Sequence, residues 1–264
     1  HMLRYTIKRV LGMIPTLIIV VTFVFFFVRL IPRDPARLVA GEQATLQDVE
    51  AVRERLGLNQ PVYIQYIKYI LGLLQGDLGT SLRTSRPVLT EVASRYWNTM
   101  ALTIASLIWS TIVGVILGVW SGKNRGKWQD FTGMTLAVSG ISLPNFWIGF
   151  LLIMLFSVKL RWFPTTGAGS WRNLVLPAIT LGTSIAAIIA RFTRSSIVEV
   201  MKEDYIRTAR AKGLKEKTVI WAHAFRNSMI SVVTVVGLQF GFLLGGSVVT
   251  EAVFAYPGLG QLLI

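Results

Sequence analysis

The charged side chains that could do chemistry are concentrated in one polar stretch, residues 191–227. It lies between two apolar segments, each long enough to cross a bilayer as a helix. The stretch holds nine Lys/Arg (191, 194, 202, 207, 210, 212, 215, 217, 226) and four acids (Glu199, Glu203, Asp204, Glu216).

The periodicity of this stretch predicts a helix, a glycine turn and a second helix. Apolar residues recur at every fourth position in its first part (Ile197, Met201, Tyr205, Ala209), so we expect one apolar ridge on a charged helix. Gly213 stands where a left-handed C-cap would end that helix. A second short helix is expected over 215–225. A ridge exposed in this way favours docking of a partner.

Signs of catalysis by the chain itself are missing from the sequence. No GxxxxGK[ST] loop occurs, so ATP is not expected to bind in the P-loop manner. The two histidines are His1 and His223, and there is no cysteine, which argues against a metal cluster, a disulfide framework or thiolate chemistry. We expect no cofactor on this chain, and energy from a partner.

Composition indicates a membrane protein. The chain is 53% hydrophobic and 15% charged, with a mean hydropathy of +0.56. Its formal charge of +14 flanks and separates apolar runs rather than clustering with aromatic residues, so we expect a lipid bilayer and no nucleic acid as its surroundings.

Five apolar segments are long enough to be membrane helices: residues 10–30, 98–120, 131–158, 174–190 and 228–250. None of them contains an Asp, Glu, Lys, Arg or His, since Arg29 and Glu251 stand at ends. This weighs against an ion-coupled or proton-coupled carrier, which commonly uses an ionisable residue inside the membrane.

The distribution of Lys and Arg predicts the orientation. Fifteen of them precede the first segment or lie in the second-to-third and fourth-to-fifth connections, whereas three lie in the third-to-fourth connection. Because positive residues stay inside, the N-terminus and residues 191–227 are predicted to be cytoplasmic.

The long first connection, residues 31–97, is then an extracytoplasmic helical insertion. Thr45 and Asp48 resemble a capping box that opens one amphipathic helix, and Pro61 starts a second that Gly76 ends. The two helices either cap the outer mouth of the protein or lie in the lipid headgroups.

Polar groups within the apolar segments indicate a translocation pathway near Ser142, Asn145 and Gln239. Pro144 breaks the third segment between Ser142 and Asn145. Glycines at 237, 241 and 245 would let another helix come close to Gln239. Two alternatives stay open: Pro144 only kinks a helix for packing, and Gln239 only bonds a neighbouring helix.

Several motifs together resemble one family. YIRTARAKG followed by HAFRNSMISVVT, LGLNQPVYIQY near residue 60, and TEAVFAYPGLGQLL near the end are similar to ABC-importer permeases of the dipeptide, oligopeptide, nickel and glutathione branch. The wider superfamily has Glu and Ala where this chain has Arg207 and Thr208, and Arg226 stands near the place of its later proline. The alternative for this stretch is a basic loop lying on anionic lipid.

The resemblance implies an all-α integral membrane protein with the type I ABC-importer permease fold. Residues 1–264 would form one permease domain with five membrane helices here and a sixth, expected in the family, absent from the sequence. Residues 191–227 would be the cytoplasmic coupling loop. Its ATPase-coupling residues would be Glu203, Asp204, Tyr205, Arg207, Thr208, Ala209, Arg210, Ala211, Lys212 and Gly213.

The resemblance also implies partners and a mechanism. The chain would pair with a second homologous permease, two ATP-binding cassette subunits that bind ATP and Mg, and an extracytoplasmic solute-binding protein, in the cytoplasmic membrane. It would form half of the pathway for short peptides or a similar solute by alternating access. The alternatives are a secondary transporter or channel subunit, and a membrane scaffold without a pathway; a copurifying ATPase would exclude both.

The predicted orientation has a direct test, because the chain is free of cysteine. A cysteine replacing Gln47 should react with a membrane-impermeant thiol reagent added to intact cells, and one replacing Lys215 should react only after the cells are opened. The reverse pattern of labelling would overturn the topology.

Overall fold

The computed structural model describes residues 2–30, 32, 34–41, 43–81 and 84–263. Ile31 and Ile264, at which the sequence-based bounds of the first connection and of the chain fall, lie outside these ranges. The chain divides into two compact units, residues 1–91 and 92–264, and each unit is described by itself.

Helices long and apolar enough to span a membrane occur where the sequence predicts them. They are α1 (Met2–Leu30), α5 (Val88–Lys123), α8 (Trp171–Val200) and the run Glu216–Gly246, which comprises α10 (Glu216–Thr218), η2 (Val219–Phe225) and α11 (Arg226–Gly246). A fifth is the pair α6 (Trp128–Ser142) and α7 (Asn145–Leu152) with η1 (Ile153–Lys159), bent by 100° at its break. The described residues form no β-strand, so the all-α prediction is confirmed.

Pro144 is the cause of the bend. The backbone of Leu143 is extended, at φ −85° and ψ 132°, as the residue before a proline prefers, and α6 therefore ends at Ser142. The chain resumes as α7 with Pro144 as its N-cap. The predicted break of the third segment is thus confirmed.

The first unit contains the two amphipathic helices predicted for the long connection. The helix α3 (Leu46–Arg55) begins with the capping box of Thr45 and Asp48, and α4 (Val62–Leu74) follows Pro61. A short helix, α2 (Pro35–Ala40), precedes them and is tied to α3 by an ion pair of Asp34 with Arg53.

One of these helices packs on the first membrane helix. Phe25 of α1 is buried against the rings of Tyr66 and Tyr69 of α4, and the hydroxyls of Thr22 and Tyr66 are 2.6 Å apart. Near the end of α1, Arg29 donates a hydrogen bond of 2.8 Å to Gln65 Oε1. The helix α4 therefore packs on the C-terminal part of α1 around Phe25.

The second membrane helix begins earlier than the sequence predicted. The helix α5 starts at Val88, whereas the apolar segment was placed from residue 98 and the insertion was extended to residue 97. Pro87 precedes the first turn, and its carbonyl accepts a hydrogen bond from the N–H of Glu91. Residues 88–97 are polar enough to escape a hydropathy criterion, yet they continue the helix.

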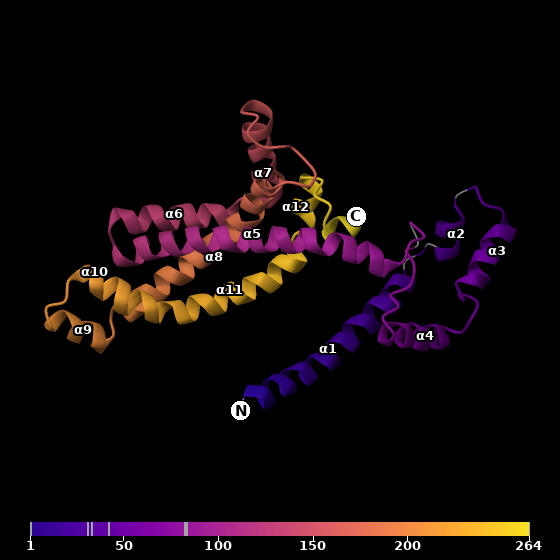
Figure 1. Ribbon diagram of the computed structural model, residues 1–264, viewed down its shortest axis with the longest axis horizontal. Helices are drawn as coiled ribbons and strands as arrows, with labels where there is room; N and C mark the ends of the chain where they lie inside the picture. The colour runs from indigo at the N-terminus through magenta and orange to yellow at the C-terminus, as the bar shows by residue number, and fades with distance from the viewer. Residues whose placement is uncertain (1, 31, 33, 42, 82–83, 264) are drawn as a thin grey trace. The chain divides into compact units, whose positions relative to one another are not determined.

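The core of the second unit surrounds α8. This helix packs on α6, α7 and α11 (Figure 1). Its inward side chains meet residues of the neighbouring helices in one apolar cluster, which includes Leu102, Leu176, Leu181, Ile185, Ile189, Val232, Leu243 and Phe254. A helix enclosed by several others has little lipid-facing surface, which makes α8 the axis of this unit.

Small residues let α5 lie against α8 at very short range. A Cβ added to Gly118 would stand 2.5 Å from Thr193 Cβ and 2.6 Å from the carbonyl oxygen of Ala190. Gly114 and Gly122, one turn away on either side, meet Ile189 and Ile197 in the same way. Close approach of backbones is the usual basis of helix association in membranes.

The glycines that the sequence singled out lie elsewhere. A Cβ at Gly237, Gly241 or Gly245 of α11 would have no atom of the described residues within 4 Å. The described residues therefore do not make the expected close approach at these glycines, and such a contact forms between α5 and α8 instead.

Two alanine substitutions separate helix propensity from packing. Alanine is the better helix former by about 0.5–1 kcal/mol, but overpacking a tight contact costs about 1–3 kcal/mol. Gly118→Ala should therefore lower the melting temperature of the purified protein, and Gly12→Ala, whose added Cβ meets no atom within 4 Å, should leave it unchanged or slightly higher. Equal melting temperatures would contradict the close contact.

Candidate functional site

The predicted coupling stretch forms a helical hairpin at one end of the second unit (Figure 1). We call residues 204–225 the hairpin: α9 (Asp204–Ala211), a glycine turn, and α10 with η2. The single helix expected up to Gly213 is wrong. The helix α8 ends at Val200, and α9 starts anew after Glu203. Acidic residues at a helix start favour this restart, which the four-residue periodicity conceals.

The apolar ridge is also different from the prediction. Ile206 and Ala209 of α9 are buried against Val219 and Ala224 of η2, with Val200 and Met201 of the preceding helix end beside them. Ile197 lies inside the bundle and is fully buried. The apolar side of α9 therefore holds the hairpin together. The larger apolar side chains that the hairpin exposes are Tyr205, Leu214 and Trp221.

Gly213 closes the first helix as predicted. Its φ of +76° lies in the left-handed region that favours glycine. The N–H of Gly213 donates to the carbonyl of Arg210 over 2.9 Å, and the N–H of Leu214 donates to that of Ala209 over 3.3 Å. These two bonds make a Schellman motif, which satisfies carbonyls that the helix end leaves open.

The outer face of the hairpin is charged. Arg210 forms two hydrogen bonds with Glu216 across the turn, the shorter of 2.7 Å, and this carboxylate raises the pKa of Arg210. Both partners are about half exposed, so the pair adds little stability. Of the ten predicted coupling residues Ala209 is buried. The others are exposed, Glu203 directly before the hairpin and the rest on it: Asp204, Tyr205, Arg207, Thr208, Arg210, Ala211, Lys212 and Gly213.

Two polar contacts fix the hairpin side of the bundle. Asn227 at the start of α11 donates to the hydroxyl of Tyr205 over 2.9 Å. One residue later, the carbonyl of Ser228 accepts a hydrogen bond of 3.3 Å from the Ser196 hydroxyl of α8. The beginning of α11 is therefore bonded to both the hairpin and α8.

An ion pair that the sequence analysis missed lies near this end. Asp130 of α6 accepts from Arg194 of α8 at 2.6 and 2.7 Å. The helices extend beyond the apolar segments that predicted them, so both residues fell outside the segments and were counted only as flanking charges. Nothing in the periodicity pairs residues that are 64 positions apart.

The three predicted pathway residues fall on two helices. Ser142 is exposed at the end of α6 and donates to the carbonyl of Val138 over 2.9 Å, and Asn145 opens α7 across the break. Gln239 lies on α11 and is half-buried. Among the described residues no hydrogen bond joins Gln239 to the other two. The structure thus brings Ser142 and Asn145 to one bend.

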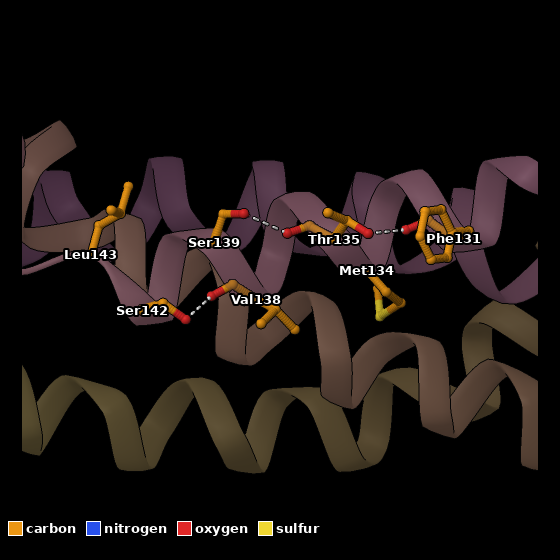
Figure 2. A pocket seen from close by; sticks show the side chains of 7 residues that line it. All are labelled: Phe131, Met134, Thr135, Val138, Ser139, Ser142 and Leu143. Atoms are coloured by element: carbon orange, nitrogen blue, oxygen red, sulfur yellow. Dashed lines mark hydrogen bonds between the residues drawn. The ribbon is translucent and has the colours of Figure 1, made fainter.

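A shallow groove runs along α6 to this bend (Figure 2). Its wall is apolar except for the hydroxyls of Thr135, Ser139 and Ser142. Each hydroxyl donates to the carbonyl four residues earlier. Since these protons are occupied within the helix, the hydroxyl oxygens offer acceptor sites along the groove.

A second residue missed from the sequence is Glu251 in α12 (Val248–Val253). Its carboxylate is fully buried. It accepts from the Thr99 hydroxyl of α5 at 2.8 Å, from the Ser247 hydroxyl at 3.0 Å and from the Gln261 N–H at 3.1 Å. Gly258 and Gly260 lie so close to this carboxylate that a Cβ at either would collide with it.

This network folds the segment after α12 onto the start of the apolar part of α5. Asn98 donates to the carbonyl of Pro257 over 2.8 Å, and Tyr256 donates to that of Asn98 over 3.0 Å. Burial, with a smaller contribution from Glu251, raises the pKa of Tyr256, so the tyrosine stays a donor. The sequence signal for this network was a Glu at the end of an apolar segment, followed by glycines seven and nine residues later.

Comparison with known families decides what kind of protein this is. Residues 114–264 match the family described as "Binding-protein-dependent transport system inner membrane component", and residues 2–103 match the N-terminal part of such membrane components. The chain belongs to this family of importer permeases.

Relatives of the permease match it along the full length of this chain. The glutathione transport system permease protein GsiC of Salmonella typhimurium strain LT2 is 55% identical over 100% of this chain and 86% of its own length. The protein of the same name from Escherichia coli K12 has the same identity and coverage, and that of Escherichia coli O6:H1 is 56% identical.

Solved structures share the permease fold at low identity. One is an inward-facing form of the MetNI methionine ABC transporter, with a TM-score of 0.57 and 22% identity over 68% of this chain and 81% of that one. Another is an amino acid ABC transporter, with a TM-score of 0.53 and 14% identity over 66% and 76%. Family and fold together favour an ABC importer over a secondary transporter or channel subunit.

Proposed function

We propose that this permease forms half of the translocation pathway of an ATP-driven importer for glutathione or a similar short peptide. The observation that carries the proposal is the 55% identity to glutathione transport permeases across the whole chain. The remaining parts of such a machine would be a second permease, two ATPase subunits that bind ATP and Mg, and a solute-binding protein outside the inner membrane.

The hairpin is the proposed contact with an ATPase subunit. Its outer face offers charged and polar side chains together with Tyr205, Leu214 and Trp221, while its inner face is held by its own apolar cluster. A hairpin with a small core of its own can be pushed as one body. This supports docking in a cleft over adsorption on lipid, because the exposed apolar side chains are few.

The proposed mechanism is alternating access. Closure of the ATPase subunits on ATP would displace the hairpin, and the helices α8 and α11, which enter and leave it, would tilt. The pathway would then pass from inward-facing to outward-facing. Transport follows only if the solute binds these two states with different affinity.

Ser142, Asn145 and Gln239 are the proposed lining of the pathway. The side-chain amides of Asn145 and Gln239 have no hydrogen-bond partner among the described residues, so they are free to meet a peptide backbone. Uncharged amides bind such a solute without the tight hold of a fixed charge. If Gln239 only joins helices, its partner lies outside the described residues, which supply none.

The identity of the solute is tested by uptake. Vesicles containing the complete importer should accumulate radiolabelled glutathione when ATP is supplied. Accumulation of a dipeptide but not glutathione would keep the importer and change its substrate, whereas ATP-independent accumulation of either would contradict the proposed function.

The glycine turn provides the test of the coupling role. Gly213 has no atom within 4 Å of an added Cβ, so a substitution there acts through backbone strain alone. A β-branched residue in the left-handed region costs about 1 kcal/mol or more. Gly213→Val should therefore uncouple ATP hydrolysis from uptake. Gly213→Asn should retain most of the coupled uptake, because asparagine tolerates the left-handed region. Normal uptake by Gly213→Val would contradict a coupling role for the turn.

The pathway has a separate test at Gln239. Gln239→Leu keeps the size of the side chain and removes its hydrogen-bonding groups, so uptake should fall while assembly and basal ATP hydrolysis stay near wild type. A bond between helices is worth about 0.6–2 kcal/mol, and its loss would appear instead as dissociation of the complex. Unchanged uptake would place the lining elsewhere.

A further inference from the structure

One carboxylate fastens three helices together at the hairpin end of the bundle. Asp130 Oδ1 accepts from Arg194 Nε at 2.6 Å and from the Ser121 hydroxyl at 2.7 Å. Its Oδ2 accepts from Arg194 Nη2 at 2.7 Å and from the Gly126 N–H at 3.0 Å. Donors from α5, from the α5–α6 turn and from α8 thus converge on a side chain of α6.

The pair is well enclosed. Asp130 has 7% of its side chain exposed, and Arg194 has 30%. A guanidinium that binds both oxygens of a carboxylate fixes orientation as well as distance. Among the described residues it is the only ion pair that joins two membrane-spanning helices, so it sets the register of α6 against α8 at this end.

The surrounding contacts do not set the register in this way. The direct packing of α6 on α8 is made by small residues: Ala137 of α6 meets Ala187 and Ala190 of α8, and a Cβ added to Gly140 would stand 3.5 Å from Ala187 Cβ. Small residues in contact allow close approach and also allow packed helices to slide. Without the pair, α8 could shift while α6 stayed behind.

The hairpin packs on the C-terminal end of α8, a few residues after Arg194. Its apolar cluster includes Val200 and Met201, which end α8, and Ser196 bonds the beginning of α11. Arg194 therefore lies on the last turns of α8, directly before the hairpin. At its opposite end α6 meets the 100° bend at Pro144.

We propose that the Asp130–Arg194 pair is a positioning element for transport, which makes α6 follow α8 when the hairpin moves and so carries the displacement to the bend beside Ser142 and Asn145. This rests on the proposed coupling role of the hairpin. Arg194 and Asp130 touch no solute in this account, because they act through the position of α6.

The test is the accessibility of the bend in two nucleotide states. Leu143→Cys is the reporter, placed in the cysteine-free permease and purified with its ATPase subunits. The rate at which a water-soluble maleimide labels the permease is measured without nucleotide and with ATP plus vanadate. Trapping should change that rate by about threefold or more, since the bend moves with α6.

Two variants interrupt the pair, and one serves as a matched control. Arg194→Lys keeps the charge and loses the two-pronged geometry, and Asp130→Asn keeps the shape and loses the charge. In both, the nucleotide-dependent change in labelling should shrink to less than about half of its parental size. Arg191→Lys, one turn earlier on α8 at an exposed position without a partner among the described residues, should keep it in full.

The outcomes separate the pair from the hairpin. A full nucleotide-dependent change in Arg194→Lys overturns the proposal, and so does a parent in which trapping leaves the labelling of Leu143→Cys unaltered. If Asp130→Asn does not assemble, Arg194→Lys decides alone. Gly213→Val, measured with the same reporter, tests the coupling role of the hairpin separately. If Gly213→Val loses the nucleotide-dependent change in labelling and Arg194→Lys retains it in full, the coupling role of the hairpin stands and the role of the Asp130–Arg194 pair is rejected.

Discussion

The close packing of α8 against its neighbours is the constraint on which the second unit depends. Gly118 and its neighbouring glycines let α5 approach the backbone of α8, and the ring nitrogen of Trp109 reaches the carbonyl of Ala178 at 2.5 Å. In a bilayer no hydrophobic force drives helices together, so such contacts and hydrogen bonds must supply the association. A helix held in this way transmits a displacement at one end along its length.

Polar side chains then act at the two ends of that packed body. Near the hairpin, Asp130 and Arg194 join α6 to α8, and Ser196 joins α8 to α11. Near α12, Glu251 and Thr99 hold the segment after α12 on α5. A buried carboxylate is costly unless it is hydrogen-bonded, and Glu251 accepts from three donors. Both ends are thus fixed by specific polar contacts between helices.

Features with a local cause could be predicted from the sequence. Length and hydropathy located the membrane segments, Pro144 located the bend, and Gly213 and the Thr45–Asp48 box located two helix ends, because each depends on residues within one or two turns. The start of α5 was missed because a polar helix carries no hydropathy signal. The interior of the hairpin, the Asp130–Arg194 pair and the Glu251 network depend on contacts between distant parts of the chain, and periodicity does not encode which helices become neighbours.

Photo-crosslinking from the tip of the hairpin tests the central claim most directly. A photoreactive phenylalanine derivative at Leu214, which is exposed beside Gly213, would be activated in intact cells and its adduct identified by mass spectrometry. Docking of an ATPase subunit predicts an adduct with a protein that contains a GxxxxGK[ST] phosphate-binding loop, and a much weaker one from the exposed Arg125 in the α5–α6 turn. An adduct with lipid alone, or none with such a protein, would contradict the account.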